Sequence, residues 1–390
     1  MVELSLMNKK MSLRDFPSAK LRREFLEKQL NIKLDQISKF TFPENQAVGR
    51  NIENLIGATQ IPLGIAGPLK LRTTNSDLRT YYIPFSTTEG ALVASVSRGC
   101  KVLLESGGAI VEVEDVGITR GPVFKVKNLE HGVETKKWIE NNFRLLSSAT
   151  AKTSSHLILL KTSVALVGAN LFVRFQYSTA DAMGMNMVTI ATNEAVKLIE
   201  QNTKAKCISL AGNFDIDKKP AWLNFIEGRG KKVWAEVILP KKVVKEVLKT
   251  TPQKIAEVVY RKNQIGSAMS GSLGFNAHFA NIIAAIFIAT GQDPAHVVEG
   301  SLGITTAEVL ENGSLYFSIY LPSLVVGTVG GGTHLPTQKE ALEIMKVSGV
   351  LEYAQVVGAA VLAGELSLIA SLAEGTLAKV HQKLGRKGAK

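Results

Sequence analysis

The sequence predicts an α+β protein with a helical N-terminal arm and a large α/β domain that carries a smaller inserted unit. Three observations lead to this fold class. Apolar residues recur at helical spacing near the N-terminus, residues 121–208 alternate strand-like with helical runs, and the chain after Gly212 is mostly helical in pattern. We therefore expect an arm at 1–48, a large domain at 49–120 and 209–390, and the inserted unit at 121–208.

The arm is expected to contain an amphipathic helix at 13–31, with Leu21, Phe25 and Leu30 on its apolar side. The following segment, from 49 to 69, is rich in glycine and proline, yet apolar residues continue throughout it. Short strands joined by tight turns fit this composition better than a linker does.

From 81 to 108 the chain begins as a strand and becomes helical after Thr87. A threonine hydroxyl can accept a hydrogen bond from a free N–H of the first helical turn, so Thr87 or Thr88 is the expected cap. In the inserted unit, strands are expected at 123–126, 171–176 and 206–211, and helices at 134–146 and 187–202.

In the C-terminal half, apolar and polar residues alternate over 314–321, which predicts a strand. Pro336 is placed to open a helix that runs to Lys346, because proline is favoured at the first helical position. A last long helix is expected over 350–380.

Composition excludes several classes of protein. Cys100 and Cys207 are the only cysteines in the sequence, too few for a disulfide scaffold, and the six histidines lie too far apart to form a zinc motif. No uncharged apolar run reaches bilayer length, since the nearest candidate, 279–291, is too short, and the N-terminus lacks a signal-peptide core. We therefore expect a soluble, cytoplasmic protein without a metal site.

The net charge of +12 leaves nucleic-acid binding as an alternative function. The lysines are spread along the chain, however, and no RNA-binding or helix-turn-helix signature interleaves them with aromatic residues. A small polyanion such as a nucleotide fits a distributed positive field equally well. We expect no nucleic-acid partner and no membrane partner.

The most informative segment is DAMGMN, from Asp181 to Asn186, which lies between a strand-like run at 170–176 and a helix-like run at 187–199. A strand-to-helix junction presents unpaired N–H groups that can face an anion. Gly184 lets a ligand approach the backbone closely. The segment is therefore a candidate ligand site.

Two carboxylic acids lie in apolar or glycine-rich surroundings. Glu89 could be a buried acid that donates a proton, or a carboxylate in a first helical turn that stabilises the helix dipole. Asp293 follows an apolar helix, where it could lie between an acid and a lysine and couple their titrations, or cap the helix that Pro294 begins.

Two kinds of cationic residue are candidates as well. Lys218 and Lys219 are adjacent, so one ammonium could stabilise a developing oxyanion while the other meets a carboxylate or phosphate; a solvated turn is the alternative. His381 precedes the basic C-terminal tail and could be a helix-dipole partner or a general acid to a leaving thiolate.

Two glycine-dense segments, 266–278 and 327–336, expose backbone amides that suit phosphate, pantetheine or ribose. Neither continues into a P-loop, and no GxGxxG fingerprint occurs in the sequence. A dinucleotide would therefore bind outside the usual Rossmann geometry.

Together these motifs resemble one family. ENLIGATQIPLGIAGPL, TTEGALVASVSRGC, ITRGP, DAMGMN, GNFDIDKKP, GSAMSGSLGFNAH, GQD, GTVGGGT and AGELSLIASLA occur in the order seen in 3-hydroxy-3-methylglutaryl-coenzyme A (HMG-CoA) reductase. The similarity extends from about residue 49 to 381 and is to the class I type, in a soluble archaeal form.

The resemblance implies an NAD(P)H-dependent, four-electron reduction of HMG-CoA to mevalonate and coenzyme A in the mevalonate (isoprenoid) pathway. A first hydride gives a thiohemiacetal, which collapses to an aldehyde and a thiolate, and a second hydride completes the alcohol. NADPH is the expected cofactor, with NADH as an alternative. A related acyl-CoA reductase with another acyl group is the alternative enzyme.

By the same resemblance, Lys218 stabilises the carbonyl oxygen, Glu89 protonates it, Asp293 links the two, and His381 protonates the departing thiolate. The residues expected at the cofactor are Asp181, Met183, Gly184, Met185, Asn186, Gly330, Gly331, Gly332 and Thr333. Those expected at the substrate are Ser95, Arg98, Arg120, Asn213, Asp217, Lys219, Lys262, His278 and Asn281.

The resemblance further implies a ferredoxin-like inserted domain and a homodimer, or a higher oligomer of dimers. In that dimer, the loop that carries Lys218 and Lys219 of one subunit reaches its neighbour's site. Two departures from the family pattern stand out. Ala211 replaces a serine that contacts HMG in many relatives, and Ser154, Ser155 and His156, with Lys152 nearby, lie where relatives hold an arginine on the 2′-phosphate.

Overall fold

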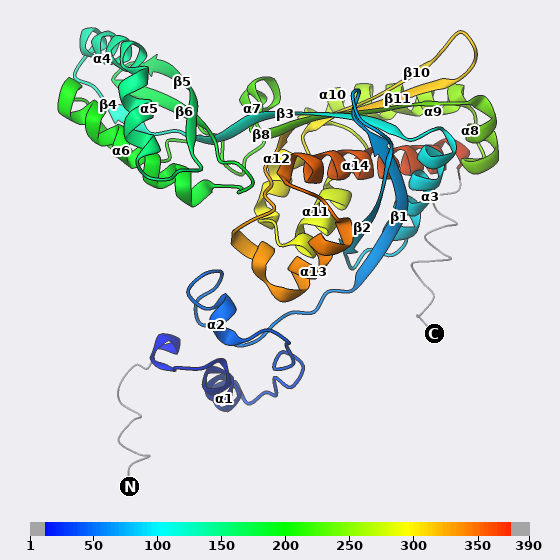
Figure 1. Cartoon of the computed structure of the whole chain (residues 1–390), viewed down its shortest axis with the longest axis horizontal. Helices are drawn as coiled ribbons and strands as arrows, with labels where there is room; N and C mark the ends of the chain where they lie inside the picture. The colour runs from blue at the N-terminus through cyan, green and yellow to red at the C-terminus, as the bar shows by residue number, and fades with distance from the viewer. Residues whose placement is uncertain (1–11, 376–390) are drawn as a thin grey trace.

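The computed structural model describes residues 12–375 of the chain. It is a mixed α and β fold built on one large mixed sheet, with a smaller lobe at one end of that sheet and the N-terminal arm set apart from both (Figure 1). The strands are β1 (Leu63–Arg72), β2 (Arg79–Ser86), β3 (Ala109–Arg120), β4 (Val123–Lys125), β5 (Ile158–Val167), β6 (Asn170–Ser178), β7 (Lys206–Ser209), β8 (Gly230–Leu239), β9 (Gly274–Phe275), β10 (Gly303–Val309) and β11 (Leu315–Leu324).

The order of strands across the sheet is β7-β4-β6-β3-β8-β11-β10-β9, with β1 beside both β2 and β3, and β5 beside β6. The helices longer than a single short turn are α1 (Ala19–Leu30), α3 (Leu92–Glu105), α4 (Leu129–Asn141), α5 (Phe143–Ala151), α6 (Met185–Thr203), α7 (Trp222–Glu227), α8 (Lys241–Val247), α9 (Pro252–Val258), the π-helix η2 (Val259–Gly266), α11 (Phe279–Thr290), α13 (Pro336–Met345) and α14 (Val350–Glu374). The short turns are η1 (Leu13–Asp15), α2 (Glu44–Ala47), α10 (Ser267–Ser270), η3 (Pro294–His296), α12 (Val297–Gly300) and η4 (Gly331–His334).

Strand β3 joins the two parts of the sheet. Its first half pairs antiparallel with β8, and its last residues, Ile118–Arg120, pair with β6 of the smaller lobe. The register shifts at Gly117, whose φ of +79° lies in the left-handed region, and a Cβ there would lie 2.5 Å from the Tyr177 carbonyl oxygen. Glycine therefore permits the close crossing that carries Arg120 to the junction of the two lobes.

Helix α14 is the centre of the large core. It lies against the sheet, with α3 and α11 packed beside it (Figure 1). Among the helices of residues 12–375, α14 alone is long and apolar enough to cross a bilayer, and 83% of its apolar window is buried in the protein, as is typical of a core helix. The expectation concerned uncharged runs, and because Glu365 interrupts the apolar stretch of α14, this helix does not contradict it.

Replacing Gly99 with alanine is expected to destabilise the fold. Gly99 lies where α3 meets α14, and a Cβ there would overlap the backbone of Ala363. Because a fully buried backbone atom cannot move aside cheaply, we expect Gly99→Ala to cost about 1–3 kcal/mol, the usual cost of overpacking a core. The measurement is the midpoint of thermal unfolding. The control is Gly266→Ala, where the nearest atom, the Arg261 carbonyl oxygen, would lie 3.4 Å away; equal midpoints for the two variants would contradict the prediction.

The smaller lobe has its own core between helices α4, α5 and α6 and one face of its strands. Along the chain its elements run β4-α4-α5-β5-β6-α6-β7, and its strands lie in the order β7-β4-β6-β5, all pairings being antiparallel. The strands predicted at 123–126, 171–176 and 206–211 are confirmed by β4, β6 and β7, and the helix predicted at 187–202 by α6. The helix expected at 134–146 is two helices, α4 and α5.

Other expectations were partly wrong. The arm helix α1 exposes Leu21 and Leu30, and its buried polar residue is Arg22, which donates to the carbonyls of Leu13, Phe16 and Leu55. Helix α3 begins at Leu92, so neither Thr87 nor Thr88 caps it. The segment 53–62 is irregular, and strands β3, β5, β8, β9 and β10 were not predicted.

The predictions for the last third of the chain fared better. The strand expected at 314–321 is β11, and Pro336 opens α13, which ends at Met345. Helix α14 follows the long helix expected from residue 350, as far as the described residues extend.

Candidate active site

A cavity of about 870 Å³ lies where the smaller lobe meets the large one. Three segments form much of its wall: the loop between β6 and α6 with the first turn of α6, the lysine loop (residues 210–221), and the glycine loop (residues 327–333). The lining includes Arg50, Asn51, Arg120, Met183, Gly184, Met185, Asn186, Asp217, Lys218, Asp293, Gly330, Gly331, Gly332 and Thr333.

The strand-to-helix junction predicted at 181–186 is confirmed, because β6 leads into a loop and α6 begins at Met185. Gly184 is the N-cap, with φ +89°, and no described side chain caps the helix there. The first N–H groups of α6 therefore have no intrahelical partner, and the segment lines the cavity. Asp181 is engaged elsewhere: its carboxylate accepts the Val350 N–H at 2.8 Å and so ties this loop to the start of α14.

The glycine loop supplies open backbone. Gly330 and Gly331 have φ values of +75° and +56°, and a Cβ on either would have no described atom within 4 Å. Gly332 instead packs against Gly291, so a Cβ there would lie 2.6 Å from the Gly291 carbonyl oxygen. Glycine is thus required for conformation at two positions and for close packing at a third. Among the described residues, no hydrogen bond uses the N–H groups of Gly330–Gly332, which are therefore available to a ligand.

An ion pair lies in this cavity. Lys218 Nζ is 2.7 Å from Asp293 Oδ2, although the two residues are 75 positions apart in the chain. Asp293 also caps the turn that Pro294 begins, accepting the Ala295 N–H at 3.0 Å. Partial burial by itself raises the pKa of Asp293, but the Lys218 ammonium and the Ala295 N–H outweigh it and hold that pKa below its ordinary value. The capping role considered for Asp293 is therefore confirmed, and so is its contact with a lysine, but Glu89, the acid expected on its other side, lies elsewhere.

Arg120 and Asp217 border the same cavity. Arg120 Nη1 lies 3.6 Å from the buried Asp215 carboxylate, while its Nε has no hydrogen-bond partner among the described residues. Burial raises the pKa of Asp215, although Arg120 and Arg229 act in the opposite direction. Lys219 donates to the Asp217 carbonyl at 3.0 Å, and Asn213 is exposed on the lysine loop.

Glu89 lies elsewhere. It is exposed, precedes the first turn of α3, and accepts a hydrogen bond from Asn281 at 3.3 Å. Both readings of Glu89, as a buried acid and as a first-turn carboxylate, were therefore wrong for this chain by itself. Asn281 is the third residue of helix α11 and Asp293 lies beyond its last residue, Thr290, so the helical part of this segment alone separates the two by about 14 Å.

The other predicted substrate residues group near Glu89 or along α14. Ser95 Oγ is 2.9 Å from Ser367 Oγ, and Arg98 donates to the same hydroxyl at 3.0 Å. Burial lowers the pKa of Arg98, although Glu374 opposes the effect.

His278 Nε2 lies 2.9 Å from the Gly364 carbonyl oxygen. Lys262 belongs to η2 and lines a separate groove of about 370 Å³. His381 lies outside the described residues.

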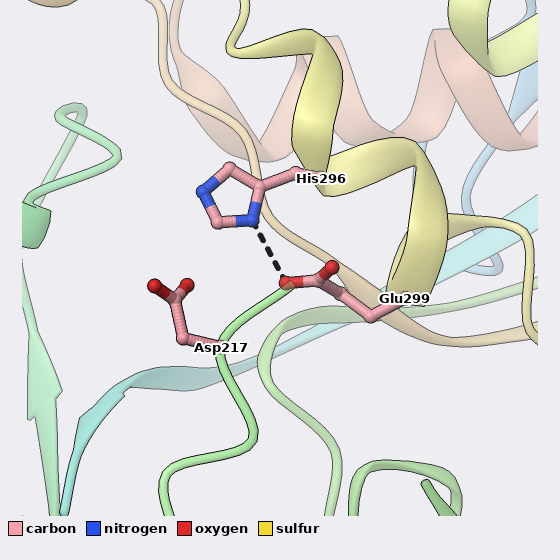
Figure 2. A group of neighbouring side chains, drawn as sticks. All are labelled: Asp217, His296 and Glu299. Atoms are coloured by element: carbon pink, nitrogen blue, oxygen red, sulfur yellow. Dashed lines mark hydrogen bonds and ion pairs between the residues drawn. The ribbon is translucent and has the colours of Figure 1, made fainter. Parts of the chain in front are cut away.

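A buried charged cluster beside the lysine loop was not predicted. Asp217, His296 and Glu299 place ligand-type atoms within 4.8 Å of one another (Figure 2). Arg229, which is fully buried, donates to Glu299 Oε1 at 2.6 Å and forms an ion pair with Asp217 Oδ1, 2.9 Å from its Nη2. The only sequence signal was the His-x-x-Glu spacing at 296–299, which places both side chains on one side of a helical turn.

Comparison with known proteins settles the family. The sequence model described as hydroxymethylglutaryl-coenzyme A reductase matches residues 18–386. The chain belongs to this family. It is 51% identical to the 3-hydroxy-3-methylglutaryl-coenzyme A reductase of Pyrococcus horikoshii, over 95% of this chain and 92% of the relative. It is 52% identical to the reductase of Methanocaldococcus jannaschii, over 95% of this chain and 93% of the relative.

The fold of this reductase-family chain also matches solved structures. The class II 3-hydroxy-3-methylglutaryl-CoA reductase from Streptococcus pneumoniae, bound to NADPH, aligns with a TM-score of 0.70 over 93% of this chain and 100% of that one. The identity is 19%, so this likeness concerns the fold. Within that fold, the predicted site residues form two separate groups: one around Lys218 and Asp293 in the cavity, and one around Glu89, Ser95 and Arg98.

Proposed function

We propose that this reductase converts HMG-CoA to mevalonate and coenzyme A, as an oxidoreductase of the mevalonate pathway, at an active site shared between two subunits. Membership of the family supports the reaction. The observation that supports a shared site is the separation of Glu89, which contacts Asn281, from the Lys218–Asp293 pair by most of the length of α11. A two-fold symmetric dimer could bring one subunit's Glu89 to the other subunit's ion pair, and do so twice.

NADPH is the cofactor that we propose for the cavity. The uncapped start of α6 and the open glycine loop offer N–H groups to phosphate, and Arg50, Arg120 and Lys218 add positive charge. Met183, Gly184, Met185, Asn186 and the glycines of the glycine loop would hold the dinucleotide, and Asp181 would support them from behind. When bound, the reduced nicotinamide would supply hydride to the substrate carbonyl carbon.

The protein's own groups would manage charge and protons. Lys218 would hold its ammonium at the carbonyl oxygen, where negative charge develops as the thioester is reduced. Asp293 would keep that ammonium in place, since the two are already paired at 2.7 Å. Arg120, Asn213, Asp217 and Lys219 would bind the carboxylate and hydroxyl of the HMG group, in keeping with the unpaired Nε of Arg120.

The partner subunit would complete the site. Glu89 would donate the proton to the carbonyl oxygen, and its exposure in one chain by itself is consistent with an acid that is buried only on assembly. Ser95, Arg98, Lys262, His278 and Asn281 would contact the substrate and the coenzyme A portion. His381 would protonate the departing thiolate.

Finer features of the classification are proposals as well. The chain shares 51% and 52% of its aligned residues with two archaeal reductases but 19% with a class II enzyme. This difference in sequence identity supports a class I, archaeal-type reductase and a cytoplasmic location. The element order of the smaller lobe supports a ferredoxin-like domain at 121–208, inserted between 49–120 and 209–390, with the arm at 1–48.

The test is a spectrophotometric assay that follows nicotinamide absorbance with HMG-CoA and each cofactor in turn. We expect HMG-CoA to be reduced and an acyl-CoA without the distal carboxylate to be a poor substrate, because Arg120 would lose its partner. Equal rates with both substrates would favour the alternative of a related acyl-CoA reductase. Nucleic-acid binding would require tight DNA affinity that falls steeply with salt, which we do not expect.

Preference for NADPH is expected to depend on the loop at 152–156. The strand pair Ile158–Ser178 places this loop beside the end of β6, from which the chain enters the β6–α6 loop. Replacing both Lys152 and His156 with alanine should lower the ratio of kcat/KM for NADPH over NADH by about tenfold or more, since a hydrogen bond to a charged group is worth roughly 1.5–3 kcal/mol. Lys125→Ala is the control, because Lys125 pairs with Asn170 at the opposite end of β6. An unchanged ratio in the double variant would contradict this placement of the 2′-phosphate.

A further inference from the structure

We propose that Glu299 and His296 are positioning residues that hold the lysine loop and the Lys218–Asp293 pair in the arrangement used for catalysis. This inference rests on the role proposed above for that pair. Neither residue lines the cavity, and both are fully buried behind it. They would act through their contacts with Lys218 and Asp293.

One oxygen of Glu299 is the centre of the cluster. Oε1 accepts from Arg229 Nη1 at 2.6 Å and from the backbone N–H of Lys218 at 3.3 Å, and it lies 2.8 Å from His296 Nδ1 (Figure 2 shows the last contact). A buried carboxylate that loses such partners is costly, so the contacts fix its position. The lysine loop is thereby attached to α12 through the backbone of the proposed catalytic lysine itself.

The lysine loop needs this support. Asn213, Ile216 and Lys218 have φ values of +63°, +52° and +56°, in the left-handed region that residues other than glycine adopt only at a cost. Such a conformation persists when its surroundings fix it. Two further contacts do so, since Thr119 Oγ1 donates to the Asp215 carbonyl at 2.8 Å and Asn224 donates to the Ile216 carbonyl at 2.9 Å.

His296 faces the ion pair from behind. Because Nδ1 lies against Glu299 Oε1, the ring is oriented with Nε2 toward Asp293 Oδ2, 3.8 Å away. That Nε2 is buried and has no hydrogen-bond partner among residues 12–375. The His296 ring therefore packs between the Glu299 and Asp293 carboxylates, behind the ion pair.

The charged groups around His296 are few. Asp293 and Glu299 come from its own segment, Asp217 and Lys218 from the lysine loop, and Arg229 from the residue before β8. Asp217, His296 and Glu299 have the composition of a cation site. However, the Arg229 guanidinium binds both carboxylates, at 2.6 and 2.9 Å, and supplies the positive charge that a metal ion would bring. We therefore assign the cluster to positioning.

The experiment measures reduction of mevaldehyde, which releases no thiolate and so does not depend on the proposed role of His381. We expect Glu299→Gln and His296→Gln to fold and to lower kcat about 10- to 100-fold, the effect of a catalytic group displaced by about 1 Å, with KM changed less than about threefold. Two variants serve as matched controls. Glu343→Gln removes an exposed carboxylate that pairs with Lys339 on α13, and His131→Gln replaces a half-buried histidine of α4.

Two outcomes would overturn the proposal: variants with near wild-type kcat, or a wild-type enzyme that a chelator inactivates and a divalent cation restores. If Glu299→Gln does not fold, His296→Gln decides alone, because that substitution leaves the contacts of Glu299 with Arg229 and the Lys218 N–H in place. A wild-type protein that reduces neither HMG-CoA nor mevaldehyde would refute the proposed function instead, so the two failures are distinguishable.

Discussion

Lys218→Ala is expected to lower kcat for HMG-CoA reduction by about a hundred- to a thousandfold, the range seen when a group that stabilises an oxyanion is removed. KM should change little, because the ammonium would act most strongly on charge that develops in the transition state. The fold should be retained: the Lys218 side chain is 39% exposed, so its truncation leaves no buried cavity. Steady-state kinetics and thermal unfolding of the same preparation measure both effects.

Two lysines serve as controls. Lys161 forms an ion pair with Glu227 at 2.9 Å and is comparably exposed, but it lies in β5 away from the cavity, so Lys161→Ala should retain wild-type turnover. Lys219→Ala should raise KM for HMG-CoA more than it lowers kcat, because Lys219 is proposed to bind the substrate. A Lys218→Ala enzyme with near wild-type kcat would remove the lysine from the mechanism.

Features set by neighbouring residues could be predicted from the sequence. The junction at 181–186 was recognised because a strand-like run, a glycine and a helix-like run follow one another directly, and β6, Gly184 and α6 occupy those places. The proline that opens α13 was recognised for the same reason. Such patterns depend on backbone conformation within one turn, which local sequence largely determines.

Features that depend on distant partners were missed. Strand β8 begins at Gly230 with two lysines directly after it, and the pattern predicted helix there. Lys231 is buried in the strand because Asp115, on the neighbouring strand β3, lies 2.6 Å from its ammonium, a partner that local sequence does not indicate. Glu89 was expected to be buried because apolar residues follow it in the chain, but those residues belong to α3 and Glu89 lies in the loop before it. The residues that would cover Glu89 belong to a second subunit, so no pattern in the sequence around Glu89 could predict its surroundings.

The pairing of Lys218 with Asp293 was expected from the resemblance, whereas its support was not. Arg229 and Glu299 are 70 positions apart and look like ordinary surface charges in the sequence. Only the fold shows that both are fully buried and that they meet behind the lysine loop. A charged residue whose partner is remote in sequence therefore cannot be assigned before the topology is known.

Mixing two inactive variants is expected to restore activity if the site is shared. Glu89→Gln and Lys218→Ala each remove one half of every site in their own homodimers. In a mixed dimer, one site would receive Glu89 from the Lys218→Ala subunit and Lys218 from the Glu89→Gln subunit, while the other site would lack both. Random exchange of subunits at equal concentration would make half of the dimers mixed, so about one quarter of wild-type activity should return, since a two-fold dimer has two equivalent sites.

The recovered activity discriminates between the two arrangements of the site. If Glu89 acted with Lys218 of its own chain, no combination of these subunits would hold both residues, and the mixture would stay inactive. Mixing Lys218→Ala with Asp293→Asn is the matched control: both residues lie in one chain, 2.7 Å apart, so exchange should restore nothing. Partial denaturation and refolding of the mixture would ensure exchange, and tagged subunits would measure the fraction of mixed dimers. Recovery only in the Glu89→Gln mixture, in proportion to that fraction, is the result that a site built from two chains requires.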